Sequence, residues 1–219
     1  QPNPFKEMHI GHLVNNIIGE SVSRIIENAG AEVKRTTYHG DIGLHVAKAI
    51  WAMQQQKASS GDITVELLGQ MYAVGSTAYD EDENAKKDIT ALNKIIYERS
   101  NEGVNELYDN GRKISLDHFK KIYERLGSKF DYAFLESEAG VVGAQLVREH
   151  VSDGIFEESE GAVVFKGEQY GLHTRVFLNS GGLPTYEAKD LGLIPLKREK
   201  YDFTSSLVVT DVEQSSYFG

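Results

Sequence analysis

Cysteine is absent from this sequence of 219 residues. Without thiols the chain can form no disulfide, no thiolate-held zinc site or iron–sulfur cluster, and it has no cysteine nucleophile. The sequence also lacks an apolar run long enough to span a bilayer, and its first residues do not have the pattern of a signal peptide. We therefore expect a cytoplasmic protein without a membrane partner.

Basic residues are few: Lys and Arg number 23 against 33 for Asp and Glu, which gives a net charge of -10. This balance argues against a basic surface over the whole chain of the kind that binds nucleic acid or acidic lipid. The composition is otherwise typical of folded proteins, with 40% hydrophobic and 26% charged residues. This composition excludes disordered and fibrous classes, and the length allows a sizeable core.

Helical and strand patterns alternate at both ends of the chain. Apolar spacing of three and four predicts a helix over residues 12–28, then a strand over 31–38 and a helix over 44–53. Toward the other end we expect strands over 162–166, 174–178 and 206–210, and a helix over 186–193. Such alternation favours an α/β fold built on a parallel sheet.

The middle of the chain is charged and has helical spacing from residue 63 to about residue 126. The acidic run over 80–83 is expected to begin a helix, where carboxylates complement the helix dipole. Residues 115–117 are expected to cap another helix. We therefore divide the chain into a first half of the sheet domain (1–55), a mostly helical insertion (56–160) and a second half (161–219).

Two histidines, His9 and His12, lie on either side of Gly11 at the start of the first expected helix. A helix N-terminus attracts phosphate, and imidazoles there can stabilise charge that develops on phosphate oxygens. Gly11 leaves room for a flat base to approach the backbone. The motif therefore suits attack on the α-phosphate of a nucleoside triphosphate. Two other interpretations are local hydrogen bonds at a helix cap, and a weaker metal site without a third ligand.

Tyr186 and Asp190 are four residues apart and share one helix face. A phenol and a carboxylate placed in this way could bind a guanidinium through charge-assisted hydrogen bonds. Gln214 follows the last expected strand, where parallel sheets bind ligands. From the residues alone, Asp190 could be a solvated acid on a helix surface. Asp41, which follows Gly40, could be part of a common turn.

Several segments, taken in order, resemble the class I aminoacyl-tRNA synthetases, and the context is closest to the arginyl-tRNA synthetase family. Residues 9–12 match the HIGH motif, with Asn3 just upstream, and residues 40–43 match the Gly-Asp-x-Gly segment of that family. The Glu-Ser-Glu of residues 136–138 and the Tyr-x-x-x-Asp of residues 186–190 continue the likeness. The resemblance spans nearly the whole chain. One departure is Val14, which stands where many family members have arginine.

The resemblance implies a Rossmann-like fold. It also implies an enzyme that activates L-arginine with ATP and Mg²⁺, without zinc, and transfers the arginyl group to the 3′ end of tRNA(Arg). It implies that His9, Gly11 and His12 bind ATP and that the two histidines are catalytic. It further implies that five residues contact arginine and that none holds a metal. These five are Asn3, Asp41, Tyr186, Asp190 and Gln214.

The chain begins with Gln1, and only residues 211–219 follow the last expected strand. We therefore expect a piece of a larger protein, with the second class I signature (KMSKS), the anticodon-binding domain and most tRNA contacts outside it. Two alternatives stay open. One is another HIGH-type synthetase or nucleotidyltransferase, and the other is a non-catalytic paralogue that acts as a binding module.

Overall fold

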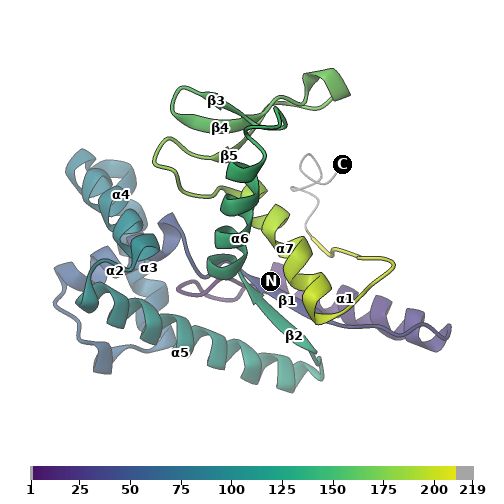
Figure 1. Cartoon of the computed structure of the whole chain (residues 1–219). Helices are drawn as coiled ribbons and strands as arrows, with labels where there is room; N and C mark the ends of the chain where they lie inside the picture. Colours follow the sequence, from purple (N-terminus) through teal and green to yellow (C-terminus); the bar gives the residue numbers. More distant parts are fainter. Residues whose placement is uncertain (1, 211–219) are drawn as a thin grey trace.

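The computed structural model describes residues 2–210 (Figure 1). The α-helices in this part of the chain are α1 (Ile10–Asn28), α2 (Leu44–Gln55), α3 (Val65–Glu81), α4 (Glu83–Glu98), α5 (Glu102–Leu126), α6 (Glu136–Glu149) and α7 (Tyr186–Lys200). The strands are β1 (Thr36–His39), β2 (Tyr132–Leu135), β3 (Glu157–Ser159), β4 (Ala162–Phe165) and β5 (Arg175–Leu178). Two short 3₁₀ turns, Ser60–Asp62 and Glu168–Tyr170, complete the described elements.

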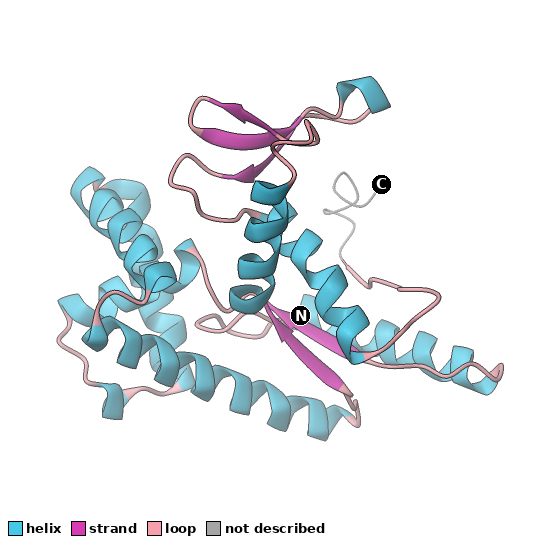
Figure 2. Ribbon diagram, in the orientation of Figure 1, coloured by secondary structure: helices cyan, strands magenta, loops and turns pink. Residues whose placement is uncertain are grey.

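Strands β1 and β2 form a parallel pair, with Thr36 opposite Tyr132 and His39 opposite Leu135. Helix α6 begins directly where β2 ends and packs against α7, as Figure 2 shows. The α/β class with parallel pairing is thus confirmed. β2, however, was not predicted from the sequence, and it comes from within the segment expected to be an insertion.

The strands expected near residues 162–166 and 174–178 are present as β4 and β5, but they pair antiparallel, together with β3, in a separate sheet. The strand expected over 206–210 is wrong: these residues are coil, and Leu207 and Val208 are exposed. A strand is held by hydrogen bonds to a neighbouring strand. No strand among residues 2–210 pairs with this segment.

The helical character of the middle segment is confirmed by α3, α4 and α5. The acidic run is divided between two helices, because Asp82 caps α4 and accepts a hydrogen bond from Asn84 N at 2.8 Å, whereas Asp80 lies in the last turns of α3. The cap expected at residues 115–117 is wrong. Ser115 lies inside α5, where its hydroxyl donates back to Gly111 O at 2.8 Å. A serine of this kind satisfies its hydroxyl within the helix without ending it.

The main hydrophobic core lies between α2, α3, α4 and α5. Phe5, from the loop before α1, is fully buried in this core and adopts a left-handed backbone conformation with φ of 66°. Its backbone N–H donates to the Ser115 hydroxyl at 3.1 Å. A Cβ atom on Gly111 would lie 2.5 Å from the Phe5 ring, so glycine at position 111 makes room for it. The start of the chain is therefore anchored on α5.

A smaller core joins α6 and α7 to the antiparallel sheet through Ala144, Val147, Phe156, Leu178 and Ala188. Helix α1 differs from the other helices, because its apolar side chains are largely exposed: Ile10 is 72% and Ile25 68% accessible. Figure 1 shows α1 extending to one side of the molecule. None of the helices within residues 2–210 is both long and apolar enough to cross a membrane.

Candidate functional site

The two histidines of the HIGH motif form a reciprocal cap at the start of α1. His9 Nδ1 accepts a hydrogen bond from Gly11 N, and His12 Nδ1 accepts one from His9 N, each at 3.2 Å. The two ring centroids are 3.8 Å apart. A Cβ atom on Gly11 would lie 3.1 Å from the His9 ring, so glycine lets this ring fold back over the helix start. The structure therefore contains the local hydrogen bonds that the helix-cap interpretation of the two histidines predicts.

The cap also sets the chemistry of His12. Burial, together with the neighbouring His9, lowers the pKa of His12 to about 4, so its imidazole is neutral at neutral pH. A neutral ring whose Nδ1 accepts a hydrogen bond has its hydrogen on Nε2. His12 therefore has an Nε2–H donor that is not used in the cap and can bind a phosphate oxygen.

A second group of side chains meets at the carboxyl ends of the parallel strands, immediately after β1 and β2. Asn3 Oδ1 accepts a hydrogen bond from Gly40 N at 3.1 Å. A Cβ atom on Gly40 would lie 2.9 Å from Asn3 Oδ1 and 3.0 Å from Glu136 Oε1. Ligands of open parallel sheets bind at this edge.

Glu136 and Lys189 form a buried ion pair beside Gly40. Lys189 Nζ donates to Glu136 Oε2 at 2.6 Å, and the two side chains are only 6% and 9% exposed. Burial raises the pKa of Glu136, Lys189 opposes that rise, and the charges of Asp41 and Asp190 add to it. The carboxylate of Asp190 is thus close enough to Glu136 to act on it.

Asp41 lies at the base of this group and has no exposed surface. It accepts hydrogen bonds from Ser137 N at 2.8 Å, Ser137 Oγ at 2.7 Å, Tyr108 OH at 3.2 Å and Arg112 Nη1 at 3.3 Å. Oδ1 accepts from Ser137 N, and Oδ2 takes the other three donors. In this structure Asp41 is a buried organiser of its neighbours.

The remaining predicted residues lie on or after α7. Tyr186 begins this helix and is 64% exposed, with its ring centroid 5.3 Å from Lys189 Nζ. Asp190 is half-buried one turn further on. Gln214 lies outside the described residues. Asn3, Asp41, Tyr186 and Asp190 therefore gather around Glu136 and Lys189.

The sequence reasoning missed Lys189 and Arg112, and it used Glu136 only as part of the family likeness. Lys189 carried a usable signal, since it lies between two candidate residues in the Tyr-x-x-x-Asp segment. Arg112 carried none. It comes from α5, and 71 residues separate it from its partner Asp41.

Two further histidines support the loops of the site. His39 Nδ1 lies 2.8 Å from Pro2 O, and His45 Nε2 lies 2.8 Å from Gly40 O. Burial lowers their pKa values to about 4 and about 3 respectively, so both rings are neutral at neutral pH and can donate to these carbonyl oxygens. They hold the chain on both sides of Asn3 and Asp41.

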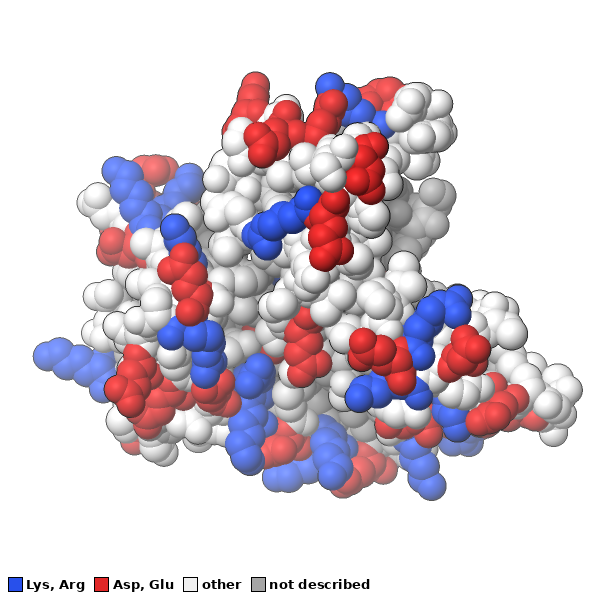
Figure 3. All heavy atoms as spheres, in the orientation of Figure 1, with Lys and Arg blue, Asp and Glu red and all other residues white. Residues whose placement is uncertain are grey.

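Within residues 2–210 no group of three or more His, Asp or Glu side chains is arranged to hold a metal ion. The histidine pair at α1 therefore gains no third protein ligand in the described part of the chain. Acidic and basic side chains are intermingled on the face shown in Figure 3.

Comparison with known proteins gives one family for the whole chain. The family model "tRNA synthetases class I (R), catalytic domain" matches residues 1–219. The arginine–tRNA ligase of Bdellovibrio bacteriovorus is 31% identical over 226 residues, which is 100% of this chain and 39% of that protein. The enzyme of the same name from Treponema pallidum is 31% identical over 224 residues, which is 99% of this chain and 38% of that protein. The chain thus spans about two fifths of the length of these curated relatives.

Solved structures agree in fold. The arginyl-tRNA synthetase of Plasmodium falciparum superposes with a TM-score of 0.76 at 22% identity, covering 100% of this chain and 37% of that one. The Thermus thermophilus arginyl-tRNA synthetase gives a TM-score of 0.61 at 24% identity, covering 88% of this chain and 34% of that one. With the family match over its full length, the chain belongs to the class I (R) tRNA synthetase catalytic domain family.

Proposed function

We propose that the protein of which this chain forms the catalytic domain is an arginine–tRNA ligase. In the first step a carboxylate oxygen of L-arginine attacks the α-phosphorus of ATP, which is supplied with Mg²⁺. The bond to the bridging oxygen breaks, pyrophosphate leaves, and arginyl-adenylate forms. In the second step the arginyl group passes to the 3′-terminal adenosine of tRNA(Arg), and AMP is released.

The charge of the buried group at the strand ends is the observation that carries the specificity for a cationic amino acid. Three carboxylates, Asp41, Glu136 and Asp190, lie near two cations, Arg112 and Lys189. Carboxylates therefore gather at the strand ends, and a carboxylate binds a guanidinium through charge-assisted hydrogen bonds. A neutral or acidic amino-acid side chain does not form such bonds with them.

We assign phosphate stabilisation to the start of α1. His9 and His12 are placed where a helix N-terminus attracts phosphate, and the Nε2–H of His12 suits an oxygen that gains charge as the leaving group departs. Gly11 keeps the region free of a side chain. No covalent enzyme intermediate is required, because positioning and charge stabilisation suffice.

On the amino-acid side, we assign arginine contacts to Asn3, Tyr186, Asp190 and Gln214. We assign Asp41 to the same arginine site, where it also holds its neighbours Ser137, Tyr108 and Arg112. Glu136 joins the group through its place between Gly40 and Lys189.

We also propose that tRNA(Arg) is bound mainly by parts of the protein outside this chain, that the enzyme works in the cytoplasm, and that it needs no zinc. The division into residues 1–55, 56–160 and 161–219 stays a prediction, with the KMSKS signature expected beyond residue 219.

ATP–pyrophosphate exchange in the intact protein tests the proposal. Each standard amino acid is supplied in turn, with and without tRNA, and exchange is expected with arginine. Exchange with another amino acid and none with arginine would contradict the specificity and favour a different class I synthetase. The absence of exchange with every amino acid, with tRNA present, would favour a non-catalytic binding module.

A further inference from the structure

Helix α6 lacks a cap of its own. Leu135 occupies the N-cap position and makes no side-chain hydrogen bond to the helix. The first turn of a helix has backbone N–H groups without partners inside the helix. Here Asp41 supplies the missing acceptor, since its Oδ1 accepts from Ser137 N at 2.8 Å and its Oδ2 from Ser137 Oγ at 2.7 Å. Glu136 is the first residue of this helix, so Asp41 fixes the turn that carries it.

Asp41 in turn depends on α5. Its carboxylate is fully buried, and a buried charge is costly unless an opposite charge and hydrogen-bond donors compensate it. Arg112 Nη1 lies 3.3 Å from Asp41 Oδ2, and Tyr108 OH lies 3.2 Å from the same oxygen. Among the described residues, Arg112 is the cation that forms an ion pair with Asp41, so it is the counter-charge of this carboxylate.

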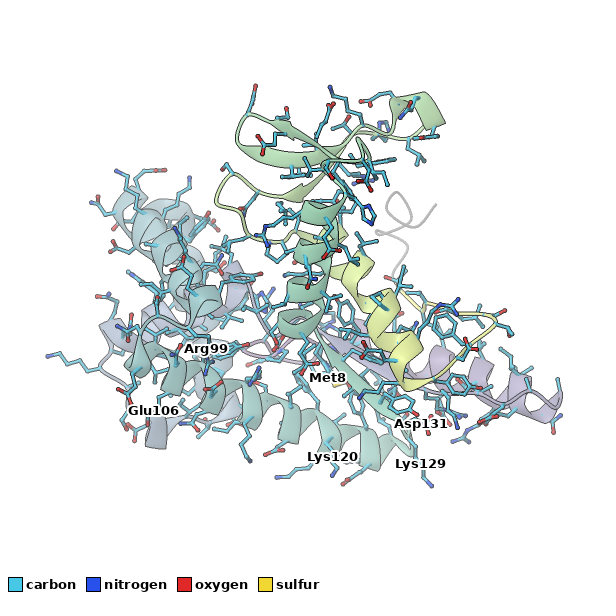
Figure 4. The ribbon with its side chains drawn as sticks, in the orientation of Figure 1. Met8, Arg99, Glu106, Lys120, Lys129 and Asp131 are labelled. Atoms are coloured by element: carbon cyan, nitrogen blue, oxygen red, sulfur yellow. The ribbon has the colours of Figure 1, made fainter. Side chains whose placement is uncertain are left out.

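Arg112 is itself held in place by a chain of ion pairs that reaches the surface. Its Nη2 lies 3.4 Å from Asp109 Oδ1, and Asp109 Oδ2 accepts from Arg99 Nη2 at 2.5 Å. Arg99 also lies over the Tyr108 ring, 5.3 Å from its centroid. Figure 4 labels Arg99 near the beginning of α5. The guanidinium of Arg112 is therefore restrained on both sides.

We propose that Arg112 is a positioning residue of the arginine-activating site. It acts through Asp41 on the first turn of α6 and so fixes Glu136 for the amino-acid side chain, without touching substrate itself. The expected change in the kinetics of arginine activation rests on the proposed function. The linkage from α5 to α6 is structural and can be measured separately.

The test uses the intact protein with Arg112→Met, Arg112→Lys and a matched control, Lys113→Met. Lys113 is the next residue of α5, but its side chain is 74% exposed and pairs with Asp117, which is 56% exposed. Two quantities are measured: KM and kcat in ATP–pyrophosphate exchange, for arginine and for ATP separately, and amide hydrogen exchange at Ser137.

We expect Arg112→Met to raise the KM for arginine by about tenfold or more, as for loss of a hydrogen bond to a charged group, with the KM for ATP nearly unchanged. The Ser137 amide should exchange faster. Arg112→Lys should recover part of both losses, because it keeps the charge but not the planar fork. Lys113→Met should match the wild type.

Two results would overturn the inference in an active protein: an arginine KM in Arg112→Met equal to that of Lys113→Met, or equal rises in KM for arginine and ATP, which indicate a general loss of structure. If the wild type shows no exchange with any amino acid, the proposed function fails and the Ser137 amide alone decides. Unchanged exchange at Ser137 in Arg112→Met then overturns the inference, and faster exchange supports it.

Discussion

The two sides of the candidate site are built in opposite ways. At the start of α1, His9 and His12 are three residues apart, and each hydrogen bond of their cap is local. At the strand ends, Asp41 and Ser137 are 96 residues apart, and Glu136 and Lys189 are 53 residues apart. The first side follows from one short motif, whereas the second needs β1, β2, α5 and α7 to be in place. Substitutions should therefore affect activity and only the local helix cap on the first side, and activity together with the wider fold on the second.

The largest effect is expected from Lys189→Met, which leaves Glu136 buried without its partner. Loss of one partner of a buried ion pair costs about 3–5 kcal/mol, and urea unfolding measures it. Lys200→Met, at an exposed position of the same helix, serves as the control and should change stability by less than about 0.5 kcal/mol. Equal losses in the two variants would show that the pair contributes nothing and would remove the contrast between the two sides.

His12→Ala should reduce adenylate formation without comparable loss of arginine binding. Removing one donor that stabilises transition-state charge lowers kcat by about 100- to 1000-fold, or about 2.7–4 kcal/mol. Pyrophosphate exchange gives the rate, and calorimetry gives the arginine affinity. Normal turnover in this variant would exclude His12 from the phosphate role.

Asp190→Asn should weaken arginine binding by about 1.5–3 kcal/mol, the range for a hydrogen bond to a charged group. Because Asp190 is only half-buried, the free energy of unfolding should change little. Calorimetry with arginine checks the first expectation and urea unfolding the second. Unchanged affinity would place Asp190 outside the arginine site.

The smallest effect concerns pH. Burial lowers the pKa of His39 to about 4, from an ordinary value of 6.5. Above pH 6.5 both the folded and the unfolded states are neutral at His39, and its contribution to stability is fully present. As the pH falls from 6.5 toward 4, the unfolded state binds the proton first. Stability therefore falls, by up to about 1.4 kcal/mol per pH unit.

His39→Gln should remove this part of the slope between pH 6.5 and pH 5, as measured by urea unfolding at several pH values. His45, whose pKa burial lowers to about 3, retains a similar contribution in both proteins. An identical slope in wild type and His39→Gln would show that the buried ring takes no part in the pH dependence.

The elements that the sequence predicted well are those set by local patterns. α1 and α2 follow from apolar spacing, and the helix start at His9 follows from the motif itself. The errors in the strands share one cause: strand pairing depends on distant residues. β4 and β5 were recognised as strands, but their antiparallel partners were not. Ser115 has the composition of a cap, yet α5 continues through it because its hydroxyl bonds within the helix.

The sequence by itself determined the family, the order of the motifs and the identity of the side chains that bear the chemistry, because short motifs place residues relative to one another through local backbone geometry. Only the tertiary structure decided what those side chains do. It buried Asp41 beneath four donors, paired Glu136 with Lys189, and brought Arg112 from α5 to the base of the site. The physical reason is that a buried charge must find its partner in space, and no pattern along the chain records which distant residue that partner is.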